Sequence, residues 1–313
     1  MAPVRSYTIL GTGAVGGFYG ARLAVAGHPV RFLGRSDVAA LRQDGLRLTS
    51  ADGDLAVEQV EAFDDPARVP ASDVVLIAVK ATMPNPAADV LARLEGGATA
   101  VVSLQNGLGV EADLEEAADG RPLAGGLCFL AANRTGPGRV EHLLGGTVTL
   151  AAHRADAAGG VLAVAADLQA AGVEATIIDD LVGARWRKLV WNLPFNSLTA
   201  LLGRTPTELL ADPDGSALIR SVIDEVVAAA AALGHPVSDG YVDGLLSITR
   251  LFPPYRTSMG LDVAAGRPTE VEVIVGRPVA HGTAAGVAMP VSTTLLRQLR
   301  TLTTPVAEAE APR

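Results

Sequence analysis

The chain has 313 residues, a net charge of −9 at pH 7 and one cysteine, Cys128. This length suits two domains of ordinary size. The negative charge argues against binding to nucleic acid or to an anionic membrane, and a single cysteine excludes an internal disulfide and a cysteine-cluster metal site.

No apolar run in the sequence reaches the ~18 residues of a membrane span. The five histidines are scattered without the paired spacing of metal ligands, so we expect no metal site. The first residues lead directly into an apolar segment and lack the shape of a signal peptide. We therefore expect a cytoplasmic protein that acts on a small molecule.

A glycine-rich turn follows the first predicted strand, at residues 7–10. Gly11-Thr12-Gly13-Ala14-Val15-Gly16 is a G-x-G-x-x-G motif, and it precedes a predicted helix at 18–26 and a strand at 30–33. In a strand–turn–helix–strand unit, the first glycine permits the turn, the second admits a pyrophosphate and the third permits close packing. The pattern predicts dinucleotide binding at a helix N-terminus.

The end of the second predicted strand should contact the ribose that distinguishes NAD from NADP. An NAD site usually has an acidic residue there, which accepts a hydrogen bond from the 2′-hydroxyl. Here Arg35 follows the strand and is placed to pair with a 2′-phosphate. Asp37 comes two residues later and suits the N-cap of a helix. We therefore predict NADP(H); a solvated surface arginine is the alternative for Arg35.

Two further strands end in polar residues. The apolar run at 73–80 ends in Lys80, and the run at 99–104 leads to Asn106. Because ligands bind at the carboxyl ends of parallel strands, Lys80 is a second candidate for the adenosine phosphate and Asn106 should face the nicotinamide half. The alternatives are a surface lysine and a turn asparagine without a function.

The composition of the sequence changes at Asp179 and Asp180, and we place the boundary between two domains there. Residues 1–179 predict a Rossmann-type NADP-binding domain, and residues 180–313 predict an all-helical substrate and catalytic domain with a loose tail at 305–313. The other segments predicted for the first domain are a hairpin or short strands at 46–60, helices at 87–94 and 161–171, and strands at 123–132, 140–150 and 173–178. The helices predicted for the second domain are 184–202, 207–210, 215–233, 237–251, one opening at 267–274, and 290–302.

The first helix of the second domain carries a polar stripe. Lys188, Asn192 and Asn196 recur every four residues, so they share one face of a mostly apolar helix. Burying such groups without partners costs several kcal/mol. A substrate with carbonyl, hydroxyl and carboxylate groups would supply partners. The alternative is a lysine that reaches solvent and two amides that bind neighbouring loops.

Several motifs in order carry a family resemblance. The chain resembles the ketopantoate reductases (2-dehydropantoate 2-reductases), NADP-dependent enzymes of pantothenate synthesis, from the glycine motif to about Leu302. The motifs are G-T-G-A-V-G at 11–16, V-K-A at 79–81, Q-N-G at 105–107, W-R-K-L-V-W-N-L-P-F-N-S-L-T-A at 186–200, T-S-M at 257–259, P-T-E-V-E at 268–272 and G-V-A-M-P at 286–290.

The resemblance implies an α/β fold, a helical domain like the C-terminal domain of 6-phosphogluconate dehydrogenases, and roles for individual residues. Lys188 would be the catalytic lysine and Glu270 the active-site glutamate. Asn106, Asn192, Asn196 and Ser258 would bind a 2-oxo acid substrate. NADP(H) would be held by Gly11, Thr12, Gly13, Ala14, Val15, Gly16, Arg35, Lys80, Asn106, Ala132 and Glu270.

Two prolines depart from the family pattern. Pro194 lies between the two asparagines and should kink the helix. Pro206 stands where better-known members tend to have another substrate-contacting asparagine. The alternative function is therefore a related NADP-dependent reductase acting on another 2-oxo acid, an imine or a hydroxy acid. A non-catalytic NADP sensor is disfavoured because Lys188 and Glu270 are both present, and the apolar helical domain is compatible with a homodimer.

Overall fold

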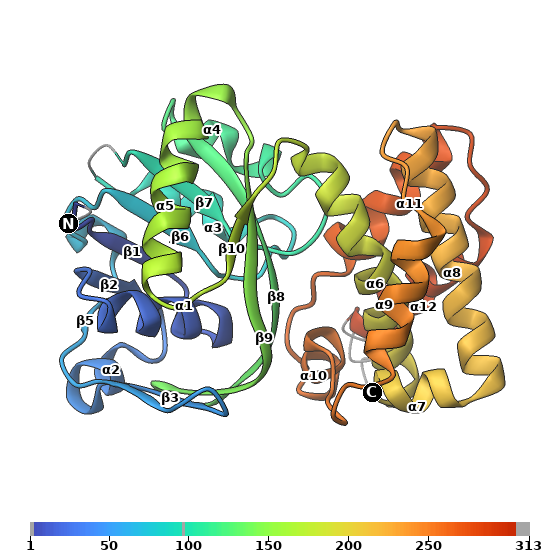
Figure 1. Cartoon of the computed structure of the whole chain (residues 1–313), viewed down its shortest axis with the longest axis horizontal. Helices are drawn as coiled ribbons and strands as arrows, with labels where there is room; N and C mark the ends of the chain where they lie inside the picture. Colours follow the sequence, from blue (N-terminus) through green and yellow to red (C-terminus); the bar gives the residue numbers. More distant parts are fainter. Residues whose placement is uncertain (1–2, 96–97, 305–313) are drawn as a thin grey trace, which may run out of the picture. The chain divides into compact units, whose positions relative to one another are not determined.

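Residues 3–95 and 98–304 are described by a computed structural model, so the predicted tail at 305–313 lies outside them. The chain divides into two units, Met1–Leu181 and Val182–Arg313. The first is built on a mixed sheet and the second is helical (Figure 1). The predicted class, a Rossmann-type domain followed by an all-helical one, is confirmed. Within the described ranges, no helix is long and apolar enough to cross a membrane.

One sheet organises the first unit, with the strand order β4-β3-β9-β8-β7-β6-β1-β2-β5 and with β10 beside β9. The six strands from β8 to β5 are parallel neighbours, in the order of a dinucleotide-binding fold. The strands are β1 (Tyr7–Leu10), β2 (Val30–Leu33), β3 (Leu46–Ser50), β4 (Leu55–Val57), β5 (Glu61–Phe63), β6 (Val74–Ile77), β7 (Ala100–Ser103), β8 (Leu123–Gly136), β9 (Arg139–Ala152) and β10 (Ala175–Ile177).

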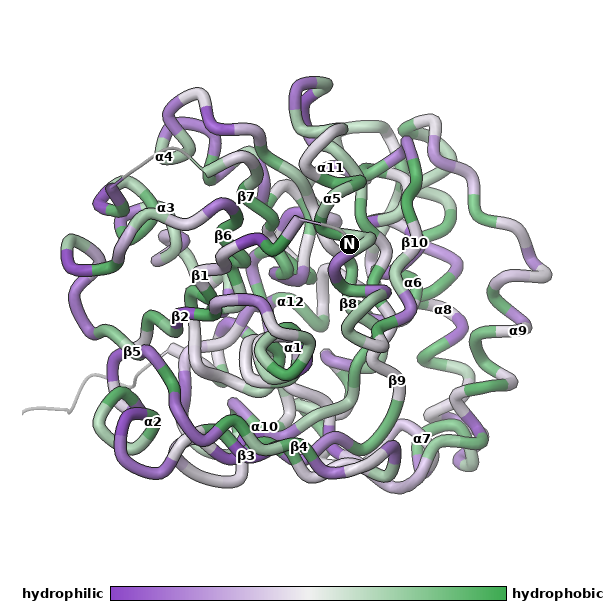
Figure 2. Tube along the Cα trace, turned by 60° about the vertical axis from the view of Figure 1, so that its left-hand side comes forward, coloured by the Kyte–Doolittle hydropathy of each residue, from purple (hydrophilic) through white to green (hydrophobic). Residues whose placement is uncertain are grey.

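The central strands are apolar throughout because both faces of the sheet are covered. Side chains alternate between faces along a strand: Tyr7 and Ile9 belong to the core beneath α1 (Ala14–Val25) and α5 (Ala158–Ala170). Leu10 belongs to a second core that packs against α3 (Pro86–Ala92) and α4 (Glu115–Ala118). Figure 2 shows the hydrophobic residues of these strands in green. The other helical segments described in this unit are α2 (Val38–Asp44) and the 3-10 turns at Pro66–Arg68, Ala112–Leu114 and Ala155–Ala157.

The hairpin predicted within residues 46–60 is confirmed, because β3 and β4 pair antiparallel. β8 and β9 form a longer antiparallel hairpin with three register irregularities. β9 also pairs in parallel with β3, so the far end of this hairpin lies beside residues 46–50. The hairpin therefore connects the last strands of the unit to the segment that follows α2.

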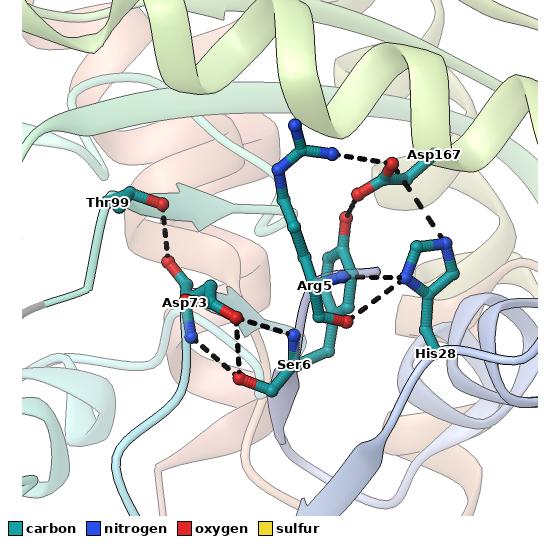
Figure 3. A network of polar contacts seen from close by, with 7 residues as sticks. Arg5, Ser6, His28, Asp73, Thr99 and Asp167 are labelled. Atoms are coloured by element: carbon teal, nitrogen blue, oxygen red, sulfur yellow. Dashed lines mark hydrogen bonds and ion pairs between the residues drawn. The ribbon is translucent and has the colours of Figure 1, made fainter. Parts of the chain in front are cut away.

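A buried carboxylate on α5 holds the beginning of β1. Asp167 is 2% exposed and accepts hydrogen bonds from the Tyr7 hydroxyl at 2.6 Å and from the Arg5 guanidinium at 2.7 Å. His28 contacts the backbone of Arg5 through its Nδ1 (Figure 3). Burial, and then the Asp167 carboxylate, raise the pKa of the Tyr7 hydroxyl far above its usual value. Tyr7 therefore remains protonated and donates to Asp167.

A second carboxylate, that of Asp73, holds the other side of the same segment. It accepts from the backbone N–H and from the hydroxyl of Ser6, both at 2.8 Å, while the Asp73 carbonyl accepts from the Thr99 hydroxyl (Figure 3). The bonds from Ser6, the backbone N–H first, lower the pKa of the Asp73 carboxyl.

Asp73→Asn should make stability less dependent on acid pH. Because the pKa of Asp73 is lower in the folded protein, its contribution is complete above the unfolded pKa of roughly 3.9 and is lost as the pH falls through the folded value. The wild type should therefore lose more free energy of unfolding than the variant between about pH 5 and pH 2. Urea unfolding at several pH values measures this difference. Equal losses in the two proteins would contradict the role given to Asp73.

The second unit is helical, as predicted, although several helix ends differ. Many helices begin at prolines in the first turn, where no N–H is needed. Pro206, for example, follows Thr205, which forms a capping box with Glu208. The helices are α6 (Leu181–Leu202), α7 (Pro206–Ala211), α8 (Pro213–Ala232), α9 (Asp239–Thr249), α10 (Ser258–Ala264), α11 (Arg277–Ala284) and α12 (Pro290–Thr303).

The prediction of a helix opening at 267–274 is wrong for residues 267–270, the first half of that range. Residues 267–270 have no regular structure, and Glu272–Gly276 forms a π-helical turn before α11. The Glu272 carboxylate binds Arg300 of α12 through two hydrogen bonds of 2.7 and 2.6 Å. A Cβ at Gly276 would lie 2.5 Å from that carboxylate, so glycine makes room for it. This wider turn begins two residues after Glu270.

Pro194 lies inside α6, and the helix runs through it as one element of 22 residues. Proline has no N–H to donate to the carbonyl of Val190. Nearby, the Asn196 side chain donates to the carbonyl of Asn192 at 3.0 Å, one turn back. The backbone around Pro194 is thus supported by a side chain of the polar stripe.

Candidate functional site

The glycine turn is shaped by contacts with the neighbouring strands. Gly11 has φ of +111°, and a Cβ there would lie 2.8 Å from the side chain of Val79. A Cβ at Gly16 would overlap the carbonyl oxygen of Gly11, whereas one at Gly13 would meet no protein atom within 4 Å. Packing therefore demands the first and third glycines but not the second. A pyrophosphate bound to the backbone does require the second.

The ends of β2 and β6 flank this turn. A Cβ at Gly34 would lie 2.7 Å from the side chain of Thr12, so the turn touches the residue before Arg35. Arg35 itself is exposed. On the other side, Val79 contacts Gly11 and precedes the half-buried Lys80. Arg35 and Lys80, the two predicted phosphate-binding cations, thus each follow a residue that contacts the glycine turn.

The turn also begins a helix whose N-terminus suits an anion. Gly13 is the N-cap residue of α1 and makes no side-chain cap, and Ala14 and Val15 follow it in the first turn. The partial positive charge of a helix N-terminus attracts phosphate groups. The residues present therefore fit a dinucleotide.

A buried amide pair connects β7 to the end of β6. Gln105 is 2% exposed, and its side chain exchanges two hydrogen bonds of 3.0 Å with Asn85. The Gln105 Nε2 also donates to the carbonyl of Val79 at 3.0 Å. Lys80 follows Val79 directly, and the half-buried Asn106 follows Gln105 directly. Gln105 opens the Q-N-G motif but was not among the predicted site residues.

Ala132 occupies a different setting from the other predicted cofactor residues of this unit. It lies in β8 opposite His142 of β9. It is half-buried and packs against the core that includes α1.

Asp37 occupies the N-cap position of α2, but its side chain does not make the predicted capping hydrogen bond. The carboxylate is completely buried and binds the guanidinium of Arg134, from β8, through both oxygens. The Ser36 hydroxyl also donates to it at 2.8 Å. An ion pair with a fixed guanidinium replaces the weaker capping interaction.

In the second unit, the polar stripe of α6 is largely buried. Lys188 is half-buried, while Asn192 and Asn196 are 7% and 3% exposed. Besides donating to Asn192, the Asn196 side chain accepts from the backbone N–H of Met259 at 3.4 Å. Asn196 thus joins α6 to the beginning of α10.

A second contact reinforces this junction. The hydroxyls of Thr199 and Thr257 lie 2.6 Å apart, and both residues are buried. Thr257 caps α10 by accepting from Gly260. Ser258 stands between two anchored residues, Thr257 and Met259, and is itself exposed. The junction presents the Ser258 hydroxyl on a fixed backbone.

Glu270 is also buried, at 6% exposure, two residues before the wider helical turn. Lys188, Asn192, Asn196, Ser258 and Glu270 all belong to the second unit. The glycine turn, Arg35, Lys80, Asn106 and Ala132 all belong to the first. Thr199 and Thr257 had no signal of their own in the sequence, beyond their places inside two of the family motifs.

The parallel sheet and its glycine turn, followed by a helical unit with a buried lysine–asparagine stripe, define the class of dinucleotide-binding oxidoreductases. The sequence profile described as "Ketopantoate reductase PanE/ApbA" matches residues 7–155, and the profile "Ketopantoate reductase PanE/ApbA C terminal" matches residues 180–303. The chain belongs to the ketopantoate reductase family.

Relatives and solved structures agree with this assignment. The chain is 40% identical over 303 residues to a 2-dehydropantoate 2-reductase of Nostoc sp., with 95% of each chain covered. It is 32% identical over 294 residues to that of Halobacterium salinarum, with 93% of this chain and 97% of the relative covered. The crystal structure of 2-dehydropantoate 2-reductase from Geobacter metallireducens has a TM-score of 0.88 and 37% identity, and the match covers 95% of this chain and 98% of that one.

A similar fold is also found in an enzyme that is named for a different reaction. A D-mandelate dehydrogenase in a ternary structure with NADH and anilino(oxo)acetate has a TM-score of 0.85 over 95% of this chain and 98% of that one. Its sequence is 22% identical, so this likeness concerns the fold alone.

Proposed function

We propose that this protein reduces 2-dehydropantoate to pantoate with NADPH, a step of pantothenate and coenzyme A synthesis. The observation that carries the proposal is the similarity, over almost the whole chain, to relatives named for this reaction. In this proposal residues 1–179 bind the cofactor, and residues 180–313 bind the substrate and carry the catalytic lysine.

The choice of NADPH rests on Arg35. It follows β2 by two residues and adjoins the contact between Gly34 and Thr12. A guanidinium at this place pairs with a 2′-phosphate, which NAD lacks. Lys80 would add a second positive charge, and Ala132 would line the cofactor site together with Asn106 and Glu270.

The reaction requires a hydride at the carbonyl carbon and a proton at its oxygen. Bound NADPH would supply the hydride. Protonated Lys188 would donate to the carbonyl oxygen, offset its developing negative charge and deliver the proton. Glu270 would favour the protonated form of the lysine or orient the substrate hydroxyl.

The remaining polar groups would hold the substrate. Asn192 and Asn106 would bind its oxygens, and Ser258 would bind the carboxylate, so that the carbonyl keeps a reactive orientation. Asn196 has its side chain engaged with Asn192 and Met259. It would contact the substrate through its remaining hydrogen-bonding capacity.

Pro206 favours an alternative substrate. It is buried at the first position of α7, where the resemblance leads one to expect a substrate-contacting asparagine. A related reductase of another 2-oxo acid, an imine or a hydroxy acid would accommodate this change. A homodimer and a cytoplasmic location stay predictions.

Steady-state kinetics test the proposal. NADPH oxidation with 2-dehydropantoate should have a higher kcat/KM than with a panel of other 2-oxo acids, and NADPH should be preferred to NADH. Arg35→Ala should raise the KM for NADPH and leave that for NADH nearly unchanged. Higher kcat/KM for another substrate would select the alternative, and equal losses for both cofactors would argue against a 2′-phosphate contact at Arg35.

Thr199→Val should weaken substrate binding through Ser258. The change keeps the shape of the side chain but removes the hydroxyl that binds Thr257, so α10 is less firmly held. We expect KM for the oxo acid to rise roughly fivefold, with a smaller change in kcat. Thr199→Ser, which keeps the hydroxyl, is the matched control. In a Ser258→Ala background the effect on KM should disappear; an unchanged effect there would show that Thr199 acts elsewhere.

A further inference from the structure

Asp37 is an acidic residue near the cofactor-specificity position, yet its charge is enclosed. It lies two residues beyond Arg35, at the N-cap of α2, and its side chain is 1% exposed. Arg134 holds both carboxylate oxygens, with Nε to Oδ2 at 2.6 Å. The Ser36 hydroxyl also donates to this carboxylate, at 2.8 Å. The carboxylate is therefore neutralised by a residue 97 positions away in the sequence.

In dinucleotide-binding sites, an acidic side chain after the second strand favours NAD over NADP. It accepts a hydrogen bond from the 2′-hydroxyl of NAD and repels the 2′-phosphate of NADP. In this protein the acid and the arginine expected to bind the phosphate are separated only by Ser36. A charged and unpaired Asp37 would oppose the action of Arg35.

The hairpin that carries Arg134 has other contacts to the segment after α2. β9 pairs with β3 over four residues, and the backbone N–H of Arg47 donates to the carbonyl of Gly138 at 2.8 Å. A Cβ at Gly138 would lie 2.7 Å from the carbonyl oxygen of Gly45, directly after α2. These contacts already hold the hairpin tip to the segment that Arg134 approaches.

We propose that Arg134 is a determinant of cofactor specificity: by binding Asp37 it removes a negative charge from the ribose end of the site and leaves Arg35 free to select the 2′-phosphate. Asp37 is held away from the ribose and is not an acceptor for the 2′-hydroxyl. The inference rests on the proposed use of NADPH, and it concerns only residues of the first unit.

The test measures equilibrium binding of 2′,5′-ADP and of 5′-AMP, which differ only in the 2′-phosphate, by isothermal titration calorimetry on the full chain. Neither ligand requires the substrate or turnover. Arg134→Gln should weaken binding of 2′,5′-ADP by roughly tenfold, because it exposes the 2′-phosphate to an unpaired carboxylate, and should change binding of 5′-AMP much less. Asp37→Asn in the same chain should restore 2′,5′-ADP binding.

Asp37→Asn alone provides a test that does not depend on an unpaired buried charge. It should bind 2′,5′-ADP at least as tightly as the wild type, because Arg134 then adds its uncompensated charge. Selective loss of 2′,5′-ADP in this variant, or failure of the double variant to recover, would overturn the proposal; the second result would mean that Arg134 contacts the phosphate itself. Equal weakening of both ligands by Arg134→Gln would also overturn it.

The wild-type values separate this inference from the proposed function. If the wild type prefers 2′,5′-ADP and the variants do not follow the pattern above, Arg134 is not the determinant and the NADPH assignment stands. If the wild type binds both ligands equally, the assignment of NADPH fails and this inference fails with it.

Discussion

Lys188→Ala is expected to lower kcat for 2-dehydropantoate reduction by roughly a thousandfold while NADPH still binds. The lysine would supply both the proton and the positive charge next to the developing alkoxide, and losses of this size are usual for such groups. Lys188 lies half-buried on the same face of α6 as the two buried asparagines. No other side chain of that stripe carries a positive charge, so the stripe itself offers no replacement for the lost cation.

The measurement is single-turnover reduction with saturating NADPH, together with NADPH binding followed by fluorescence. Arg187→Ala is the matched control, because it removes a half-buried cation from the neighbouring position of the same helix. Its kcat should stay within about twofold of the wild type. A Lys188→Ala enzyme with near-wild-type turnover would eliminate Lys188 as the proton donor.

Gly16→Ala and Gly13→Ala should separate folding from cofactor binding. A Cβ at Gly16 would overlap the Gly11 carbonyl, so the turn must open, and overpacking of this kind costs about 1–3 kcal/mol. We expect Gly16→Ala to lower the unfolding free energy without ligand and to abolish NADPH binding. A Cβ at Gly13 meets no protein atom, so Gly13→Ala should be nearly as stable as the wild type.

NADPH binding should nevertheless be lost in Gly16→Ala and strongly weakened in Gly13→Ala. In Gly13→Ala the methyl group would occupy the space that a pyrophosphate needs near the backbone, and we expect NADPH to bind on the order of a hundredfold more weakly. Urea unfolding without ligand and calorimetric titration with NADPH measure the two effects independently. Normal NADPH binding by Gly13→Ala would place the pyrophosphate elsewhere.

The sequence was sufficient for features whose causes are local. The order of β1, the glycine turn, α1 and β2 follows from apolar runs and from glycine spacing within 30 residues. The parallel order of the strands then follows from the short connections between them. The predicted helix start at Pro290 is confirmed and follows from the fixed φ of proline at a first turn, whereas the starts at Pro206 and Pro213 were predicted one and two residues too late.

Features that depend on distant partners could not be predicted. Asp37 was expected to cap α2 because capping is a local interaction, but its partner Arg134 lies in another strand. The junction of Thr199 with Thr257 joins residues 58 positions apart. The π-helical turn after Glu270 depends on Arg300 in α12 and on Gly276. In each case the sequence periodicity of one segment carries no information about the distant segment that it contacts.

The buried carboxylate of Asp167 has a consequence for the order in which the first unit can fold. Its bonds to Arg5 and Tyr7 close loops of 162 and 160 residues, and long loops are closed late and slowly. β1, which leads into the glycine turn, thus gains its last support only after α5 has been synthesised. A nascent chain that ends before residue 167 would leave the apolar face beneath α5 exposed, so the nucleotide-binding unit should complete its folding near the end of its own translation.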